Sequence, residues 1–228
     1  MIRKILATTL AAFAMSGAAL AHEPGDIIVR GGLMYVSPDV DSSEVTVNGT
    51  PSAGSKVEIP HTASLFNLSG TWMAAPHLGI ELAVGGPYAY DLKTKGVINS
   101  PTLHGNKLAE VTQQPITASV QLFFLPRDYR FQPYVGVGLN YTSFYDERFK
   151  RRQRREGWRR LEIDDSWGLA LQAGFDFMIT KNWLVNASAW RLDVDTEAKG
   201  RNRRTHERLE FDVDVDPWMY FVGVGYKF

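Results

Sequence analysis

Two stretches rich in arginine are the residues of this sequence best able to bind a ligand through charge: residues 148–160 and 199–208. A guanidinium group can hold a phosphate through two parallel hydrogen bonds, so clusters of this kind are typical of sites for polyanions. A solvated, mobile loop is the alternative interpretation. The candidate contact residues are Arg151, Arg152, Arg154, Arg155, Arg203 and Arg204.

A second set of candidates is apolar. Near residues 144, 190–194 and 213–221, apolar side chains occupy every second position, and alternate residues of a strand share a face. If these faces point inward, they form an apolar funnel that binds small hydrophobic ligands. The alternative is a small core that only stabilises the outer part of the fold. The candidates are Phe144, Trp190, Leu192, Val194, Val213, Val215, Met219 and Phe221.

Residues for covalent chemistry are scarce. The chain has no cysteine, which excludes a disulfide scaffold, a thiol nucleophile and a Cys-ligated metal site. Lipid modification by acyl transfer would need a nucleophile or general base with its partner. The five histidines fall at the expected mature terminus, in loops or at strand ends, and none has an obvious serine and carboxylate alongside. We therefore expect no enzyme, no catalytic residue, no cofactor and no metal. The histidines are His22, His61, His77, His104 and His206.

The elements that would position these residues are strands, because apolar residues alternate with small or polar ones along the chain. Glu81 stands among small residues on one face of its segment, so that face should line a lumen rather than meet lipid. The same rule predicts a polar lower lumen of Glu81, Gln121, Asn140, Gln172, Asp176, Asn186 and Ser188. The predicted strands cover residues 26–36, 62–73, 78–90, 116–125, 131–145, 167–179 and 183–195, with a terminal strand ending at Phe228.

Links between these segments are alternately short and long, which is the pattern of an outer-membrane barrel. The sequence predicts an all-β fold: an eight-stranded antiparallel transmembrane β-barrel with short periplasmic turns and long extracellular loops. Residues 1–21 read as a removed secretory signal peptide, because Arg3 and Lys4 precede an apolar stretch and Ala19-Leu20-Ala21 offers a cleavage site. Residues 22–228 would form the barrel in the outer membrane of a Gram-negative bacterium.

Four stretches resemble the OmpW family of outer-membrane barrels, which includes AlkL-type proteins: residues 78–88, 131–147, 165–196 and 216–228. The resemblance implies a monomeric barrel with a hydrophobic lumen that passes small hydrophobic molecules inward. It also implies lateral release of those molecules into the bilayer. The sequence departs from the family at Tyr90, around Gln113-Gln114-Pro115 and in its arginine-rich third loop, so no particular ligand is carried over.

Two prolines are candidates for the lateral opening. Pro87 and Pro115 should lie at similar heights on adjacent strands, and neither can donate a ladder hydrogen bond. Two independent bulges are the alternative. A barrel held in place for its loops, as a structural, adhesive or receptor protein, is the alternative function.

The expected partners follow from this location. They are outer-membrane lipid, lipopolysaccharide phosphate near the arginines, and small hydrophobic ligands. The formal net charge of +0 gives no indication of a nucleic-acid partner. Asp193, Asp195, Asp212, Asp214 and Asp216 should face outward above the lipid zone, where arginines can pair with them.

Overall fold

The protein is described by a computed structural model that covers residues 22–60, 62–97, 103 and 107–228. The predicted signal peptide, residues 1–21, lies outside the described residues, as do His61 and His104. The described part of the chain holds no helix long and apolar enough to span a membrane.

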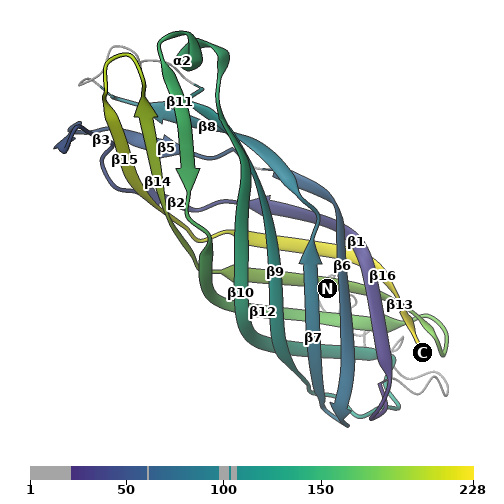
Figure 1. Ribbon diagram of the computed structural model, residues 1–228. Helices are drawn as coiled ribbons and strands as arrows, with labels where there is room; N and C mark the ends of the chain where they lie inside the picture. Colours follow the sequence, from purple (N-terminus) through teal and green to yellow (C-terminus); the bar gives the residue numbers. More distant parts are fainter. Residues whose placement is uncertain (1–21, 61, 98–102, 104–106) are drawn as a thin grey trace, which may run out of the picture.

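Eight antiparallel strands form a closed wall (Figure 1). Each strand pairs with its neighbour around the barrel, and the last strand pairs with the first over Ile28–Ser37 and Trp218–Lys227. Closure leaves no edge, so the strands satisfy one another's backbone groups without water. The predicted eight-stranded antiparallel barrel is therefore confirmed. The wall strands are β1 (Ile27–Ser37), β6 (Thr62–Ala75), β7 (Leu78–Gly85), β9 (Ala109–Phe123), β10 (Phe131–Phe149), β12 (Ser166–Met178), β13 (Trp183–Leu192) and β16 (Trp218–Lys227).

Alternation in sequence becomes two different faces in space. On β16, Val222 is 61% exposed on the outside, whereas Phe221 is only 4% exposed on the inside. Outer residues at both ends of this strand are aromatic, at Trp218 and Tyr226, as expected for the two interfacial girdles. The outer surface therefore carries an apolar belt of the kind that lipid covers.

Two predicted strand limits were wrong at the outer end of the barrel. The third predicted strand divides at Gly86-Pro87, beyond which β8 (Tyr88–Lys95) continues along β9. The fourth begins at Ala109 rather than residue 116, so Pro115 lies inside a strand instead of before it. A proline is tolerated there because the ladder toward β7 and β8 is already interrupted beside it.

Long outer segments expected as loops are mostly folded. They form a second sheet that projects beyond the barrel, which we call the outer extension (Figure 1). The reason is alternation again: Leu209, Phe211 and Val213 are buried in this sheet while the residues between them are exposed. Its strands are β2 (Val40–Ser42), β3 (Thr46–Val47), β4 (Thr50–Pro51), β11 (Trp158–Ile163), β14 (Val194–Asn202) and β15 (Arg208–Val215), with β5 (Lys56–Glu58) on β8 and helix α2 (Arg151–Arg155) at the tip.

Three layers follow one another along the barrel interior. A small apolar cluster that includes Ile28, Phe123 and Leu184 closes the periplasmic end. Buried polar residues come next, and a large apolar cluster then extends from Met34 and Met219 into the outer extension. The candidate site is built at the junction of the polar and upper apolar layers.

A charge placed on the outer belt should be costly only where lipid covers it. We expect Val222→Arg to lower the free energy of unfolding in vesicles by about 2–4 kcal/mol, because the guanidinium would enter hydrocarbon. Glu210→Arg, on an exposed position of the outer extension, should change it by less than about 0.5 kcal/mol. Urea unfolding measured by tryptophan fluorescence gives both values. Equal effects of the two changes would contradict the assigned belt.

Candidate functional site

The apolar candidates gather on the inside of the upper barrel and of the base of the outer extension. All of them are buried, and all belong to one hydrophobic cluster supplied by β10, β13, β14, β15 and β16. Their position above the lumen's polar layer matches the expected funnel, while ligand binding stays a prediction. The residues are Phe144, Trp190, Leu192, Val194, Val213, Val215, Met219 and Phe221.

This upper lumen is closely packed. A cavity lined by Trp190 and Met219 has a volume of about 10 Å³, close to the space that one water needs. The cavity extends from those two side chains to the wall of the barrel. Its lining is completed by Met34, Asn67, Ala83, Gly85, Pro115 and Thr117.

The wall is interrupted where this cavity meets it. Pairing between β7 and β9 ends at Val84 and Ile116, and pairing of β8 with β9 begins at Tyr88 and Gln113. Residues 85–87, between β7 and β8, therefore lie beside residues 114 and 115 of β9 with no ladder pairing between them. We call this interval the wall break.

The two predicted prolines both lie at the wall break. Pro115 is buried and faces the lumen, whereas Pro87 is exposed. The amide of Gly86 donates to Phe66 O at 2.8 Å, on the other neighbouring strand. A Cβ on Gly85 would come within 2.8 Å of Pro115 Cγ, so glycine permits the close approach. The two prolines thus mark one feature of the wall, while its role as an opening stays a prediction.

Side chains that sequence reasoning did not assign to the lumen lie immediately above the wall break. Tyr90 Oη donates to Gln113 Oε1 at 2.8 Å, and the Gln113 amide donates to Tyr88 Oη. The continued alternation of residues 88–95 was the available signal, but Pro87 obscured it.

A polar plug fills the barrel below the apolar funnel. Arg30, which sequence reasoning did not assign, lies at its centre and is only 1% exposed. Its Nε and Nη2 donate to the two oxygens of Asp176 at 2.9 and 2.5 Å. Its Nη1 donates to Thr71 Oγ1 at 2.6 Å and lies 3.6 Å from Glu81 Oε1. A bidentate pair of this kind satisfies both buried charges.

Amide side chains surround the second buried carboxylate. Gln121 Nε2 and Gln172 Nε2 each donate to Glu81 Oε2 at 2.8 Å. Gln172 has room because Gly136 faces it: a Cβ there would lie 2.6 Å from Gln172 Cγ. The predicted polar lower lumen is confirmed, since its remaining members are buried too. These are Asn140, Asp176, Asn186 and Ser188.

His22 has a buried carboxylate partner that sequence reasoning did not assign to it. Its Nε2 lies 2.8 Å from Asp176 Oδ2, and its ring packs edge-on against Phe123 with the centroids 4.9 Å apart. The partners are 154 positions apart, so only closure of the barrel brings them together. His77 contacts a backbone oxygen of Phe123, and His206 lies in the turn between β14 and β15.

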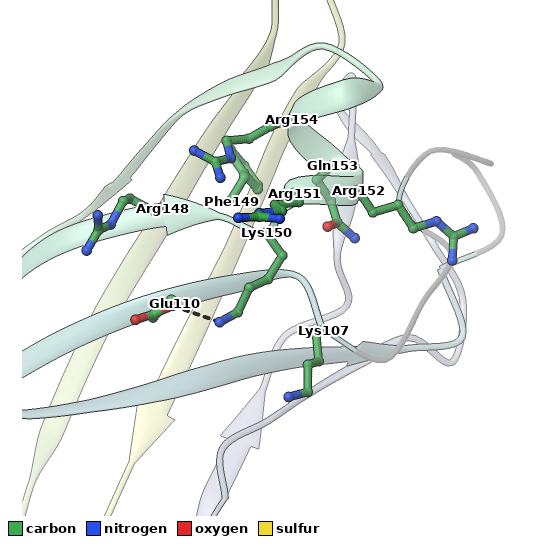
Figure 2. A pocket seen from close by; sticks show the side chains of 9 residues that line it. All are labelled: Lys107, Glu110, Arg148, Phe149, Lys150, Arg151, Arg152, Gln153 and Arg154. Atoms are coloured by element: carbon green, nitrogen blue, oxygen red, sulfur yellow. Dashed lines mark hydrogen bonds and ion pairs between the residues drawn. The ribbon is translucent and has the colours of Figure 1, made fainter.

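The arginine candidates separate into two groups. Arg151, Arg152 and Arg154 line an open cleft of about 810 Å³ beside α2 (Figure 2). Arg155 is exposed outside that lining, and Arg203 and Arg204 belong to the neighbouring turn. The two stretches do meet, because Arg203 N donates to Gly157 O at 2.9 Å.

The aspartates face outward at the base of the outer extension, as expected. Asp195, Asp214 and Asp41 lie directly opposite one another on β14, β15 and β2. The pKa of Asp195 is raised above its ordinary value, first by partial loss of hydration and then by Asp193, Asp214 and Asp216. Arg191 pairs with Asp216 at 3.0 Å and with Asp39 at 3.5 Å. Among the described residues, no three or more His, Asp or Glu side chains are arranged to hold a metal.

Comparison with known proteins gives consistent similarities. The model of the OmpW family matches residues 23–228. Outer membrane protein W of Escherichia coli is 33% identical over 215 residues, covering 94% of this chain and 93% of that protein. The crystal structure of OprG from Pseudomonas aeruginosa matches with a TM-score of 0.86 and 35% identity, over 92% of this chain and 98% of that one. Dibenzothiophene metabolism operon protein PahQ of Pseudomonas aeruginosa is 23% identical over the whole length of both chains.

The plug should depend on the charge of Arg30. We expect Arg30→Met to lower the free energy of unfolding by about 3–5 kcal/mol, because the substitution leaves the buried carboxylates of Asp176 and Glu81 without the guanidinium cation. Arg127→Met breaks an exposed pair with Glu23 and should cost less than about 1 kcal/mol. Adding Asp176→Asn to Arg30→Met should recover part of the loss. Urea unfolding in vesicles measures all three, and a double variant worse than the sum of its parts would contradict the pairing.

The stability of the outer extension should depend on pH through its facing aspartates, Asp41, Asp195 and Asp214. A carboxyl with a raised folded-state pKa opposes folding when ionised, so the outer extension should gain stability as pH falls through the pKa of Asp195. Asp214→Asn should move that pKa down toward its ordinary value, because it removes a facing charge. Asp212 lies opposite Glu197 instead, so Asp212→Asn is the control and should leave the pKa of Asp195 unchanged. Carboxyl NMR titration measures the pKa, and equal shifts in both variants would refute the assignment.

Proposed function

The chain belongs to the OmpW family, and from this premise we propose that it admits small hydrophobic molecules passively and releases them sideways into the bilayer. It is a transmembrane β-barrel of the outer membrane of a Gram-negative bacterium. The proposal concerns what enters the lumen and where it leaves.

One observation supports the proposed route: the small cavity reaches from the apolar funnel to the wall break. Trp190 and Met219 line it on the funnel side, and Gly85 and Pro115 line it at the wall. A hydrophobic solute that leaves at that point does not have to cross the polar plug around Arg30. The route thus uses the wall break, where β9 lacks a ladder partner between its pairings with β7 and β8.

The plug gives the route its direction. Below the funnel the lumen is filled by Arg30, Asp176, Glu81 and their amide partners. An apolar solute that moved toward the periplasm would have to displace these hydrogen bonds and leave buried charges unpaired. Sideways exit avoids that cost.

Close packing of the side chains around the cavity means that the proposed route is closed until they move. Because the cavity is about the size of a water, a solute can pass only after side chains move. Met219 is well suited to such movement, since an unbranched thioether adapts to irregular spaces. The funnel and the wall break belong to one chain, so a single barrel is the proposed working unit.

The expected cargo is defined by class alone. The lumen candidates are apolar, and the name of the relative PahQ refers to the metabolism of dibenzothiophene, an aromatic compound. Small apolar and aromatic molecules are therefore the substrates to test first.

A second candidate is a structural or receptor barrel that acts through its outer extension. The close packing of the upper lumen favours it, because a filled interior is what a purely stabilising core requires. Transport through the wall break and this alternative predict different outcomes in one experiment.

Restoring backbone pairing at the wall break should slow uptake. We expect Pro87→Ala combined with Pro115→Ala to reduce uptake of a small aromatic hydrocarbon by about tenfold in vesicles, because the new N–H groups can complete the ladder. Pro133→Ala, a wall proline of β10 away from the break, is the matched control and should keep uptake within about twofold. Unfolding midpoints of the variants verify that the barrels are intact.

The outcome that contradicts the proposal is unchanged uptake in the folded double variant. Uptake equal to that of protein-free vesicles in the unmodified protein would favour the structural or receptor barrel.

A further inference from the structure

The cleft beside α2 is lined mainly by basic side chains. Its lining comes from the end of β10, from α2, from the start of β9 and from the segment before it (Figure 2). The side chains are those of Lys107, Glu110, Arg148, Phe149, Lys150, Arg151, Arg152, Gln153 and Arg154.

The charges in this cleft are of two kinds. Lys150 bridges Glu110 and Asp91, and Lys107 pairs with Asp91 at 2.7 Å. The lysines are thus already neutralised. The guanidinium groups are different: no described carboxylate lies within 4 Å of any of them, and Arg148 attracts Glu110 only at longer range. These guanidinium groups belong to Arg148, Arg151, Arg152 and Arg154.

A polar group without a partner lies among these arginines. Gln153 is only 1% exposed, and its Oε1 has no hydrogen-bond donor within reach. Gln153 is the buried residue of α2, and Phe149, just before the helix, packs its ring 5.5 Å from that of Trp158. A buried carbonyl oxygen left unsatisfied costs free energy, so this position favours a ligand that brings an N–H or O–H group.

We propose that the cleft binds a phosphorylated saccharide. The arginines supply bidentate donors for a phosphoryl group, and Gln153 Oε1 supplies an acceptor for a neighbouring sugar hydroxyl. Inorganic phosphate would satisfy only the first requirement. A neutral sugar would satisfy only the second.

The distance of the cleft from the membrane indicates which phosphorylated sugars can reach it. Tyr141 and Trp167 pack against each other at the outer interface, with ring centroids 4.7 Å apart and their planes tilted by 40°. Arg148 lies seven residues further along β10, which is up to about 23 Å at 3.3 Å per residue. That position is beyond lipid head groups and at the level of sugars attached to them. The phosphorylated core of lipopolysaccharide and a soluble sugar phosphate both carry this chemistry.

The decisive measurement compares two pairs of arginines. Full-length barrel in detergent is titrated with rough lipopolysaccharide, either native or enzymatically dephosphorylated, and the Kd is measured by thermophoresis. We expect Arg151→Ala with Arg154→Ala to weaken binding of the native form by about tenfold or more. Arg203→Ala with Arg204→Ala removes the same charge from the adjacent turn and should weaken it less than about twofold.

A second variant separates the saccharide from its phosphate. Gln153→Met keeps the size of the side chain and removes the acceptor, so it should weaken binding of glucose 6-phosphate while leaving inorganic phosphate unchanged. Tight binding of native lipopolysaccharide with weak binding of glucose 6-phosphate assigns the membrane source, and the reverse assigns the soluble one.

Three results would overturn the proposal. One is equal loss in the two arginine pairs, which would indicate diffuse attraction rather than a site. Another is equal affinity for native and dephosphorylated lipopolysaccharide together with no binding of glucose 6-phosphate. The third is a Gln153→Met variant that binds both native lipopolysaccharide and glucose 6-phosphate as the unmodified protein does. None of these measurements depends on uptake, so failure of the transport route leaves the test intact.

Discussion

Every backbone N–H and C=O that crosses hydrocarbon must pair inside the protein, because lipid offers no partner. The closed wall satisfies this constraint nearly everywhere, and closure between β1 and β16 is what removes the last edge. The interruption between β7 and β8 is therefore significant. It lies where Pro115 lacks an N–H and where the Gly86 amide pairs with β6 instead, so the wall tolerates the gap at low cost.

The same constraint explains why the interior is layered. Side chains that face inward cannot reach lipid, so they must pack or pair with one another across a narrow lumen. Near the periplasm they pair, around Arg30 and Asp176; above that level they pack, around Trp190 and Phe221. The boundary between these layers coincides with the cavity at the wall break. A barrel closed below and apolar above has only its wall through which an apolar solute can leave.

Outside the membrane, the alternation of apolar and polar residues gives the outer extension a buried face and an exposed face. The outer extension is a sheet whose inner face continues the apolar cluster and whose outer face carries aspartates near the base and arginines at the tip. Water can hydrate both sets of charges, so the repulsion between facing aspartates destabilises the sheet only modestly there. Segregation of the two signs along one extension gives the barrel two distinct surfaces: an acidic one near the bilayer and a basic one farther out.

The period of two in residues such as Val222 and Phe221 indicated the strands and their two faces, because lipid on one side and a lumen on the other require that alternation. The alternately short and long links, together with the family resemblance, then indicated the closed barrel. The period of two also placed Glu81 and Gln172 in the lumen. Strand limits near Pro87 and Pro115 were not predictable, since a proline ends a strand or sits within one according to whether its neighbour needs the missing N–H. Arg30 and His22 were not assigned to the plug because their partner, Asp176, is distant in sequence. The cleft of Gln153 exists only because β9, β10 and α2 meet in space, which no local pattern records.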